Sequence, residues 1–397
     1  MIETWRWFGP SDSISLQKIR QAGATGIVTS LHEVKTGEVW TKEAIAERKK
    51  VIEDAGLQWT VIESIPVHND IKTRTGDYLQ LIENYKQSVK NAAACGVYTI
   101  CYNFMPVVDW TRTNLMYRLP NNSHALRFEM TDFAAYDMCM LERKGAAESY
   151  APMVKAKALE RFAKMNELER QELEKNIIAG LPGGEGSYTR DSIREAIQQF
   201  IDLGTEGFRQ NLFLFLQAII PDAEAVGAKM CIHPDDPPFS LFGLPRVVST
   251  ATDAQALLDA CPSPANGLTM CAGSYGARGD NNLVQMARDF GSRIYFVHLR
   301  NVIREEDGSF FESDHLDGDN DMVGLVEALL SEEKRRSQEA NGQPYLSIPM
   351  RPDHGHLLED ELNQPGVKPG YSYVGRLKGL AELRGVIHTV GKFVNRQ

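Results

Sequence analysis

The strongest constraint on the fold is a short pattern that recurs five times along the chain. Each time a helix-forming segment reaches a glycine, and a run rich in β-branched or aromatic residues follows; the glycines are Gly23, Gly56, Gly96, Gly227 and Gly291. Glycine adopts the left-handed conformation that ends a helix at little cost, and runs of this kind suit buried parallel strands. We therefore interpret the five sites as junctions between a helix and the strand that follows it.

Three further runs, at residues 5–8, 267–271 and 345–350, bring the number of predicted strands to eight. The predicted strands start near residues 5, 26, 59, 98, 229, 267, 294 and 345. Eight strands that alternate with helices are typical of a closed, parallel (β/α)8 TIM barrel. The pattern alone leaves an open, doubly wound sheet as the alternative. We predict an α/β chain in which residues 1–397 form a single barrel domain.

The region from about residue 107 to residue 190 interrupts this rhythm and predicts a helical insertion after the fourth strand. It holds a polar stretch at 121–124, a charged helical block at 157–174 and a Gly-rich turn at 181–187. That turn lacks the Gly-Lys-Ser/Thr ending of a phosphate-binding loop. In a barrel, the loops that follow the strands lie on the face that carries the active site. The insertion is therefore either a solvated helical excursion, or a lid or dimer contact.

The composition excludes several classes of function. Acidic residues outnumber basic ones by 53 to 43, which gives a formal charge of −10, and the lysines and arginines are scattered. This offers no basic surface for nucleic acid. The longest apolar stretch, residues 212–220, is interrupted by Gln217 and is too short for the ~20 residues of a membrane span. With no secretory signal and too few cysteines for a disulfide scaffold, we expect a cytoplasmic protein without nucleic-acid or membrane partners.

Side chains that can bind a metal follow the last four predicted strands. They are His233, Cys271, His298 and Asp353. Each one alone is also compatible with a structural role in the core, but the carboxyl ends of neighbouring barrel strands meet at one rim. Two imidazoles and a carboxylate suit Mn, Fe, Ni or Zn, whereas a thiolate disfavours Mg and Ca. Since the chain has no Cys-x-x-Cys pair, we predict a catalytic metal site rather than a structural zinc site.

Other polar residues follow the same strands. His354 comes directly after Asp353, so the two side chains diverge in an extended segment and His354 is available for proton transfer. Three residues, Arg300, Asn301 and Arg351, are candidates for holding a substrate carboxylate by paired hydrogen bonds. Three more, Glu63, His68 and Asn103, follow the third and fourth strands. These last three either contact a polyhydroxylated substrate or position loops.

With these motifs in view, the sequence resembles the D-mannonate dehydratase family over essentially its whole length. The motifs that carry the resemblance are residues 5–10 (WRWFGP), 231–238 (CIHPDDPP), 271–274 (CAGS), 297–301 (VHLRN) and 351–356 (RPDHGH). The resemblance implies a xylose-isomerase-like barrel. It also implies a lyase that converts D-mannonate to 2-keto-3-deoxy-D-gluconate and water in hexuronate (glucuronate) catabolism.

The resemblance further implies Mn²⁺ or Fe²⁺ as the cofactor, held by the four residues already selected from the strand ends. The catalytic pair that it implies is His354 and a tyrosine after the last strand. Tyr371 and Tyr373 are the two candidates, and Tyr371 is preferred. Which member of the pair is the base stays open.

Two other functions are compatible with the same residues. A divalent-metal sugar isomerase or epimerase on the same barrel would also use the cation, but has less need for arginines that bind a carboxylate. A non-catalytic protein that binds sugar acids would need no acid–base pair. We expect a small sugar-acid ligand in each case, and a homodimer.

Overall fold

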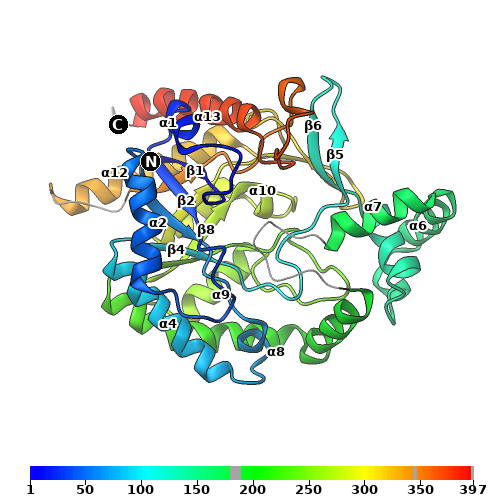
Figure 1. Ribbon diagram of the computed structural model, residues 1–397. Helices are drawn as coiled ribbons and strands as arrows, with labels where there is room; N and C mark the ends of the chain where they lie inside the picture. Colours follow the sequence, from blue (N-terminus) through cyan, green and yellow to red (C-terminus); the bar gives the residue numbers. More distant parts are fainter. Residues whose placement is uncertain (179–188, 343–346, 395–397) are drawn as a thin grey trace.

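The structure, a computed structural model, describes residues 1–178, 189–342 and 347–394. Eight parallel strands close into a barrel in the order β1-β12-β9-β8-β7-β4-β3-β2 (Figure 1). The strands are β1 (Ile2–Arg6), β2 (Gly26–Thr29), β3 (Gln58–Glu63), β4 (Thr99–Tyr102), β7 (Lys229–Ile232), β8 (Asn266–Cys271), β9 (Ile294–His298) and β12 (Pro349–Arg351). The predicted TIM barrel is confirmed. The first strand starts three residues earlier than predicted, and residues 345 and 346 lie outside the described residues.

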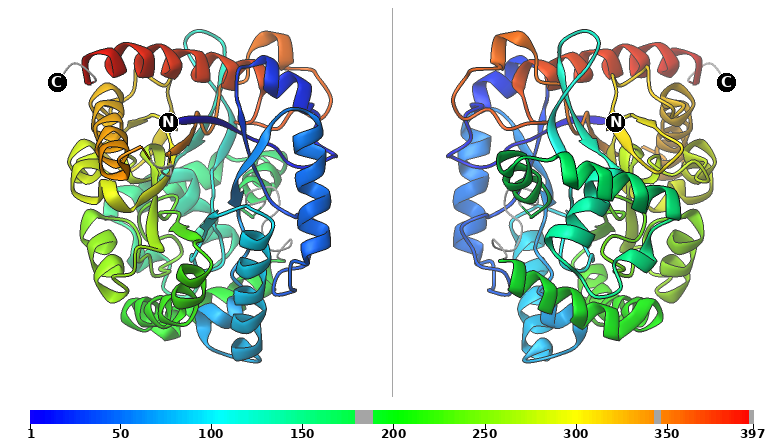
Figure 2. Two further views of the ribbon diagram at one scale, coloured as in Figure 1. Left: turned by 90° about the vertical axis from the view of Figure 1, so that its left-hand side faces the viewer. Right: turned by 90° about the vertical axis from the view of Figure 1, so that its right-hand side faces the viewer.

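Helices surround the barrel on its outer side, and one four-residue helix, α10, lies at its carboxyl rim (Figure 1 and Figure 2). They are α1 (Leu16–Gln21), α2 (Lys42–Asp54), α3 (Asn69–Thr73), α4 (Tyr78–Ala94), α8 (Arg190–Ala225), α9 (Ala251–Ala260), α10 (Ala272–Tyr275), α11 (Leu283–Phe290), α12 (Met322–Ala340) and α13 (Tyr373–Val394). They start from local signals, as in α2, where the Thr41 side chain accepts a hydrogen bond from the Ala44 amide. Ile45 and Ile52 then face the core. None of the described helices is long and apolar enough to cross a membrane.

Four of the five junction glycines have the predicted positive φ: Gly23, Gly56, Gly96 and Gly227. The prediction is wrong at Gly291, whose φ is −46°. There α11 passes into a short 3-10 turn, η3 (Gly291–Arg293), before β9 begins. A 3-10 turn satisfies the last helical carbonyls without a left-handed residue.

The predicted insertion does follow β4, but its first part is a β-hairpin. Strands β5 (Asn114–Arg118) and β6 (His124–Phe128) are joined by the polar stretch, in which Asn122 has a φ of +66°. Helical elements follow: α5 (Met130–Ala135), η1 (Tyr136–Met140), η2 (Ala147–Ser149), α6 (Pro152–Lys164) and α7 (Glu167–Ile178). In Figure 1, α6 and α7 project to the right of the barrel. The Gly-rich turn at 181–187 lies outside the described residues.

The hairpin belongs to a second sheet, which sequence patterning did not predict. This antiparallel sheet has the order β10-β11-β6-β5 and includes β10 (Val302–Arg304) and β11 (Phe310–Glu312) from the segment after β9. Phe310 of β11 pairs with Phe128 of β6, and their rings stack at 5.8 Å. The sheet therefore ties the insertion to the loop that follows the seventh strand of the barrel.

Candidate active site

The four predicted metal ligands come from four strands that are adjacent in the barrel, β7, β8, β9 and β12. The register explains why they meet: Cys271 at the end of β8 is the Cα partner of His298, and His298 is the partner of Arg351. His233 directly follows β7, and Asp353 lies two residues after β12. All four residues thus lie at the same carboxyl rim, as predicted.

Their donor atoms converge. His233 Nε2 lies 3.2 Å from His298 Nδ1, and both imidazoles and the Cys271 sulfur lie within 4.8 Å of one another. Asp353 Oδ2 is 3.9 Å from Cys271 Sγ and 3.9 Å from His298 Nδ1. Metal–nitrogen and metal–sulfur bonds of about 2.0–2.3 Å put the donors of one ion roughly 3–4 Å apart. The residues therefore fit a divalent cation with little rearrangement.

The charges at this rim also suit a cation. Burial alone would raise the pKa of Cys271, but Arg300 and His233 outweigh burial and hold that pKa well below its usual range. The site thus favours a thiolate, which is the ligand form. Burial lowers the pKa of His233, yet the Cys271 thiolate next to it raises that pKa to about 10. A cation that binds here must displace this imidazole proton.

The Asp353 carboxylate is held in place by two arginines. Arg351 Nη1 lies 2.5 Å from Asp353 Oδ1 and Arg300 Nε lies 2.9 Å from Oδ2. Burial would raise the pKa of Asp353, but Arg351, His354, His298 and Arg300 keep it well below its usual range. Its backbone has a φ of +67°, a conformation that aspartate tolerates better than most residues and that often marks functional sites.

A second group of side chains forms a hydrogen-bonded chain beside the ligands. Glu312 Oε1 lies 2.7 Å from His354 Nδ1, and His354 Nε2 lies 3.0 Å from the Tyr371 hydroxyl. Burial raises the pKa of Tyr371 to about 12. Burial would also raise the pKa of Glu312, but His354 and two arginines lower it to about 2. Tyr373, the other candidate, donates to the Lys18 carbonyl at the surface.

Because Glu312 is ionised, the His354 Nδ1 proton is directed toward it, and Nε2 is left with a lone pair beside Tyr371. His354 and Tyr371 therefore form an acid–base pair in geometry. Both line a cleft of about 330 Å³ that is open to solvent.

The predicted substrate-binding residues divide into two groups. Glu63, Asn103 and Arg351 line the cleft. Arg300 and Asn301 do not line it. Arg300 is 2% exposed and pairs with Asp236 at 2.7 Å, Glu312 at 2.6 Å and Asp353. Its guanidinium is occupied by protein carboxylates, so the geometry favours a positioning role, and the contact of Arg300 with a substrate carboxylate stays a prediction.

Asn301 is fully buried and positions loops. Its amide donates to the carbonyls of His315 and Asn320, and its oxygen accepts from two backbone amides. Every hydrogen-bonding position of the side chain is thus filled by backbone groups. The geometry therefore favours a structural role for Asn301, and its contact with substrate stays a prediction.

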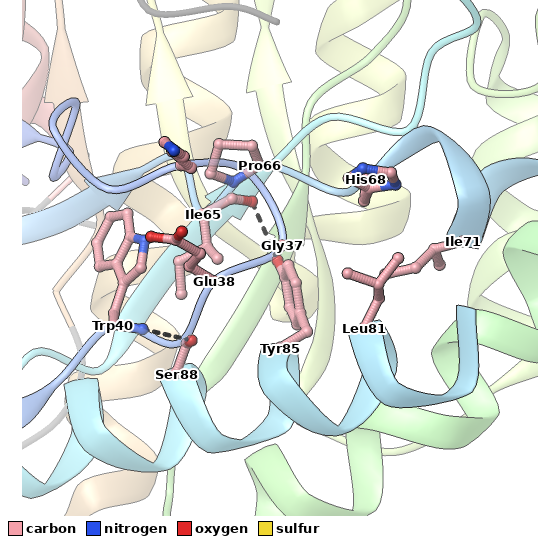
Figure 3. A pocket seen from close by; sticks show the side chains of 11 residues that line it. Gly37, Glu38, Trp40, Ile65, Pro66, His68, Ile71, Leu81, Tyr85 and Ser88 are labelled. Atoms are coloured by element: carbon pink, nitrogen blue, oxygen red, sulfur yellow. Dashed lines mark hydrogen bonds between the residues drawn. The ribbon is translucent and has the colours of Figure 1, made fainter. Parts of the chain in front are cut away.

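His68 is also placed away from the cleft. Its ring caps α3 by accepting a hydrogen bond from the Asp70 amide at 3.1 Å. It lines a different hollow, of about 280 Å³, between α4 and the loops after β2 and β3. Figure 3 shows His68 at one side of this hollow, near Ile71 and Leu81. In this structure His68 caps α3 and does not contact the cleft.

Sequence reasoning missed several charged residues around the site. Asp236, which lies within the 231–238 motif but was given no role, lines the cleft and pairs with Arg112 and Arg300 at 2.7 Å each. Glu312 comes from β11 of the second sheet. Asp236 carried a signal, since it lies three residues after a proposed ligand. Glu312 carried none, because a three-residue strand has no readable period.

Comparison with known proteins covers the whole chain. A family model described as D-mannonate dehydratase (UxuA) matches residues 1–397. The mannonate dehydratase of Saccharophagus degradans is 75% identical over 390 residues, 98% of this chain and 98% of its own. Mannonate dehydratase 2 of Agrobacterium fabrum is 54% identical over 397 residues, 100% of this chain and 99% of its own. The crystal structure of mannonate dehydratase from Streptococcus suis serotype 2 has a TM-score of 0.77 at 33% identity, and the match covers 99% of this chain and 95% of that one.

Proposed function

This chain belongs to the D-mannonate dehydratase family, and on that premise we propose that it removes water from D-mannonate to give 2-keto-3-deoxy-D-gluconate in hexuronate catabolism. The observation that carries the proposal is the meeting of a His, Cys, His and Asp ligand set with the His354–Tyr371 pair at one barrel rim. Family membership favours this hydro-lyase reaction over the isomerase and the non-catalytic binding protein that the sequence alone left open.

The enzyme depends on a divalent metal ion, for which we propose Mn²⁺ or Fe²⁺. His233, Cys271, His298 and Asp353 would hold it, and mixed nitrogen, sulfur and oxygen donors suit these ions better than Mg²⁺ or Ca²⁺. When bound, the ion supplies Lewis-acid stabilisation of the negative charge that develops on the substrate carboxylate as C2 loses its proton.

For the protons, His354 is proposed as the base and Tyr371 as the acid. With a pKa of about 12, Tyr371 keeps its proton at neutral pH, whereas His354 Nε2 offers a lone pair because Nδ1 donates to Glu312. Nε2 takes the proton from C2, the C3–O bond breaks, and the Tyr371 hydroxyl protonates the departing oxygen to give water. The resulting enol loses the proton of its C2 hydroxyl and gains one at C3, and so becomes the keto acid. The 3.0 Å contact then returns the proton from His354 to Tyr371.

Isotope exchange tests this assignment. In D₂O, Tyr371→Phe is expected to lose product formation but to exchange the C2 hydrogen of unreacted D-mannonate, because the base remains. His354→Asn is expected to lose both. Exchange that persists in His354→Asn and disappears in Tyr371→Phe would reverse the two roles.

Three further features are part of the proposal. A single domain is supported by β1 and β12, which come from opposite ends of the chain and pair in one barrel. A cytoplasmic location is supported by six cysteines that are all free.

A homodimer is supported by exposed Met153, Leu159 and Leu168 on the projecting α6 and α7. Light scattering of the wild type and of Leu159→Glu tests the dimer, since a charge at a buried contact should release monomers.

A further inference from the structure

The carboxylates that line the cleft are of two kinds. Most are paired closely with arginines, at 2.5–3.0 Å; these are Glu63, Asp236 and Asp353. Asp109, in the loop after β4, is not. Its Oδ1 lies 3.9 Å from Lys72 Nζ, its Oδ2 accepts a hydrogen bond from Asn103 at 3.4 Å, and its side chain is 31% exposed. Asp109 therefore keeps hydrogen-bonding capacity for a ligand in the cleft.

Lys72 lies beside Asp109, and its ammonium has only a long contact with that carboxylate. Its side chain is 5% exposed, and Asp109 is the one carboxylate within 4 Å of its ammonium among the described residues. The backbone fixes its place: His68 caps the short helix α3, and Asn211 of α8 donates to the Lys72 carbonyl at 2.9 Å. Lys72 does not itself line the cleft, so its ammonium acts there by attracting and positioning the Asp109 carboxylate.

The third group is the neighbouring Trp110, which also lines the cleft. Its side chain is almost fully buried, and its indole Nε1 has no hydrogen-bond partner. Its ring is held edge-on to His354 at 6.1 Å and lies 4.8 Å from the Arg112 guanidinium. Because Nε1 has essentially no accessible surface, Trp110 contributes its ring to the cleft lining, where it offers a flat apolar surface to the C–H groups of a sugar chain.

Resting on the proposed dehydratase function, we propose that Asp109, positioned by Lys72 and flanked by the Trp110 ring, binds a hydroxyl group of the substrate beyond the reacting C2 and C3 atoms. A sugar hydroxyl can donate to the Asp109 carboxylate while the C–H groups beside it pack on the Trp110 ring. His354 and Tyr371 line the same cleft, and the cation ligands His233 and Asp353 also border it. The trio then makes the enzyme select six-carbon aldonates over shorter ones.

The test compares two substrates: D-mannonate, and a four-carbon aldonate with the same configuration at C2 and C3. Wild-type enzyme should prefer D-mannonate in kcat/KM. Lys72→Met and the isosteric Asp109→Asn should each reduce this preference about 10- to 100-fold, because the first releases and the second neutralises the carboxylate that only the longer substrate reaches. If the short acid is not turned over, its inhibition constant against D-mannonate replaces its kcat/KM.

A matched control is Lys86→Met, which removes a partly buried lysine that pairs with Asp222 on the outer helices at 3.7 Å; its preference should equal that of the wild type. The inference would be overturned if both Lys72→Met and Asp109→Asn kept the wild-type preference, whether kcat/KM stayed the same or fell equally for the two substrates. Wild-type enzyme that turned over neither acid would instead remove the dehydratase proposal itself, and this inference with it.

Discussion

Replacement of Glu312 by glutamine is the sharpest test of the acid–base chain. Glu312 accepts the Nδ1 proton of His354 at 2.7 Å, which leaves His354 Nε2 free to act as a base 3.0 Å from Tyr371. Glutamine has nearly the same shape but no charge, and its amide nitrogen can turn toward the ring. The imidazole then carries its proton on Nε2, where it cannot take one from substrate.

The expected loss follows from the bond that is weakened. A charge-assisted hydrogen bond contributes about 1.5–3 kcal/mol, and 1.36 kcal/mol corresponds to a tenfold change in rate, so kcat should fall about 10- to 150-fold. KM should change little, since Glu312 is 3% exposed and does not line the cleft. The assay is keto-acid formation from D-mannonate, with metal content measured on the same samples.

Glu305→Gln provides the matched control. Glu305 lies between β10 and β11 of the same sheet. Its carboxylate pairs with Arg127 at 2.6 Å and not with His354. It should keep wild-type kcat, and Glu312→Asp should recover part of the lost rate because the charge returns. A wild-type kcat in Glu312→Gln, or a rise in KM at unchanged kcat, would refute the orienting role.

Three other outcomes are expected. Cys271→Ser and His298→Asn should lose metal and activity together in metal analysis and rate assays, and EDTA-treated wild type should regain activity with Mn²⁺ or Fe²⁺; full turnover without added metal would contradict this. Gly273→Ala should lower the free energy of unfolding by about 1–3 kcal/mol, because the added Cβ would lie 2.2 Å from Arg300 Nε. It should also weaken metal binding in titrations, because Arg300 contacts Asp353. In metal-free protein, the stability that ionised Glu312 contributes is complete above its ordinary pKa of 4.5 and is lost as pH falls toward 2, so denaturant melts of Glu312→Gln should show a shallower acid slope than wild type.

The parts of the structure that sequence could predict are those set by local repetition. The helix–glycine–strand pattern located five of the eight barrel strands and three further runs located the others, and a side chain at the end of each of the last four strands must reach the shared rim. That is why the convergence of His233, Cys271, His298 and Asp353 at one rim could be predicted without coordinates. Adding Tyr371 needed the family resemblance, because the loop before it has no period that fixes its path.

The residues that sequence reasoning could not place lie where direction depends on contacts far along the chain. Arg300 and Asn301 follow β9 directly, but side chains alternate faces and the strand has ended, so local pattern does not fix which way each one points. His68 caps a helix of five residues, too short for periodicity to reveal. Glu312 depends on the pairing of β11 with β6, whose residues are separated by more than 180 positions.

Arg300 links the predicted metal ligands to the His354–Tyr371 pair. Arg300 contacts the predicted ligand Asp353 through Nε and the orienting carboxylate Glu312 through Nη1, at 2.9 and 2.6 Å. The barrel strands supply the ligands, while the second sheet supplies Glu312, so one buried guanidinium fixes the distance between the metal ligands and the proton-transfer pair. A change on the insertion that moves β11 should therefore reduce catalysis before it unfolds the barrel, because the barrel strands do not depend on that sheet for their pairing.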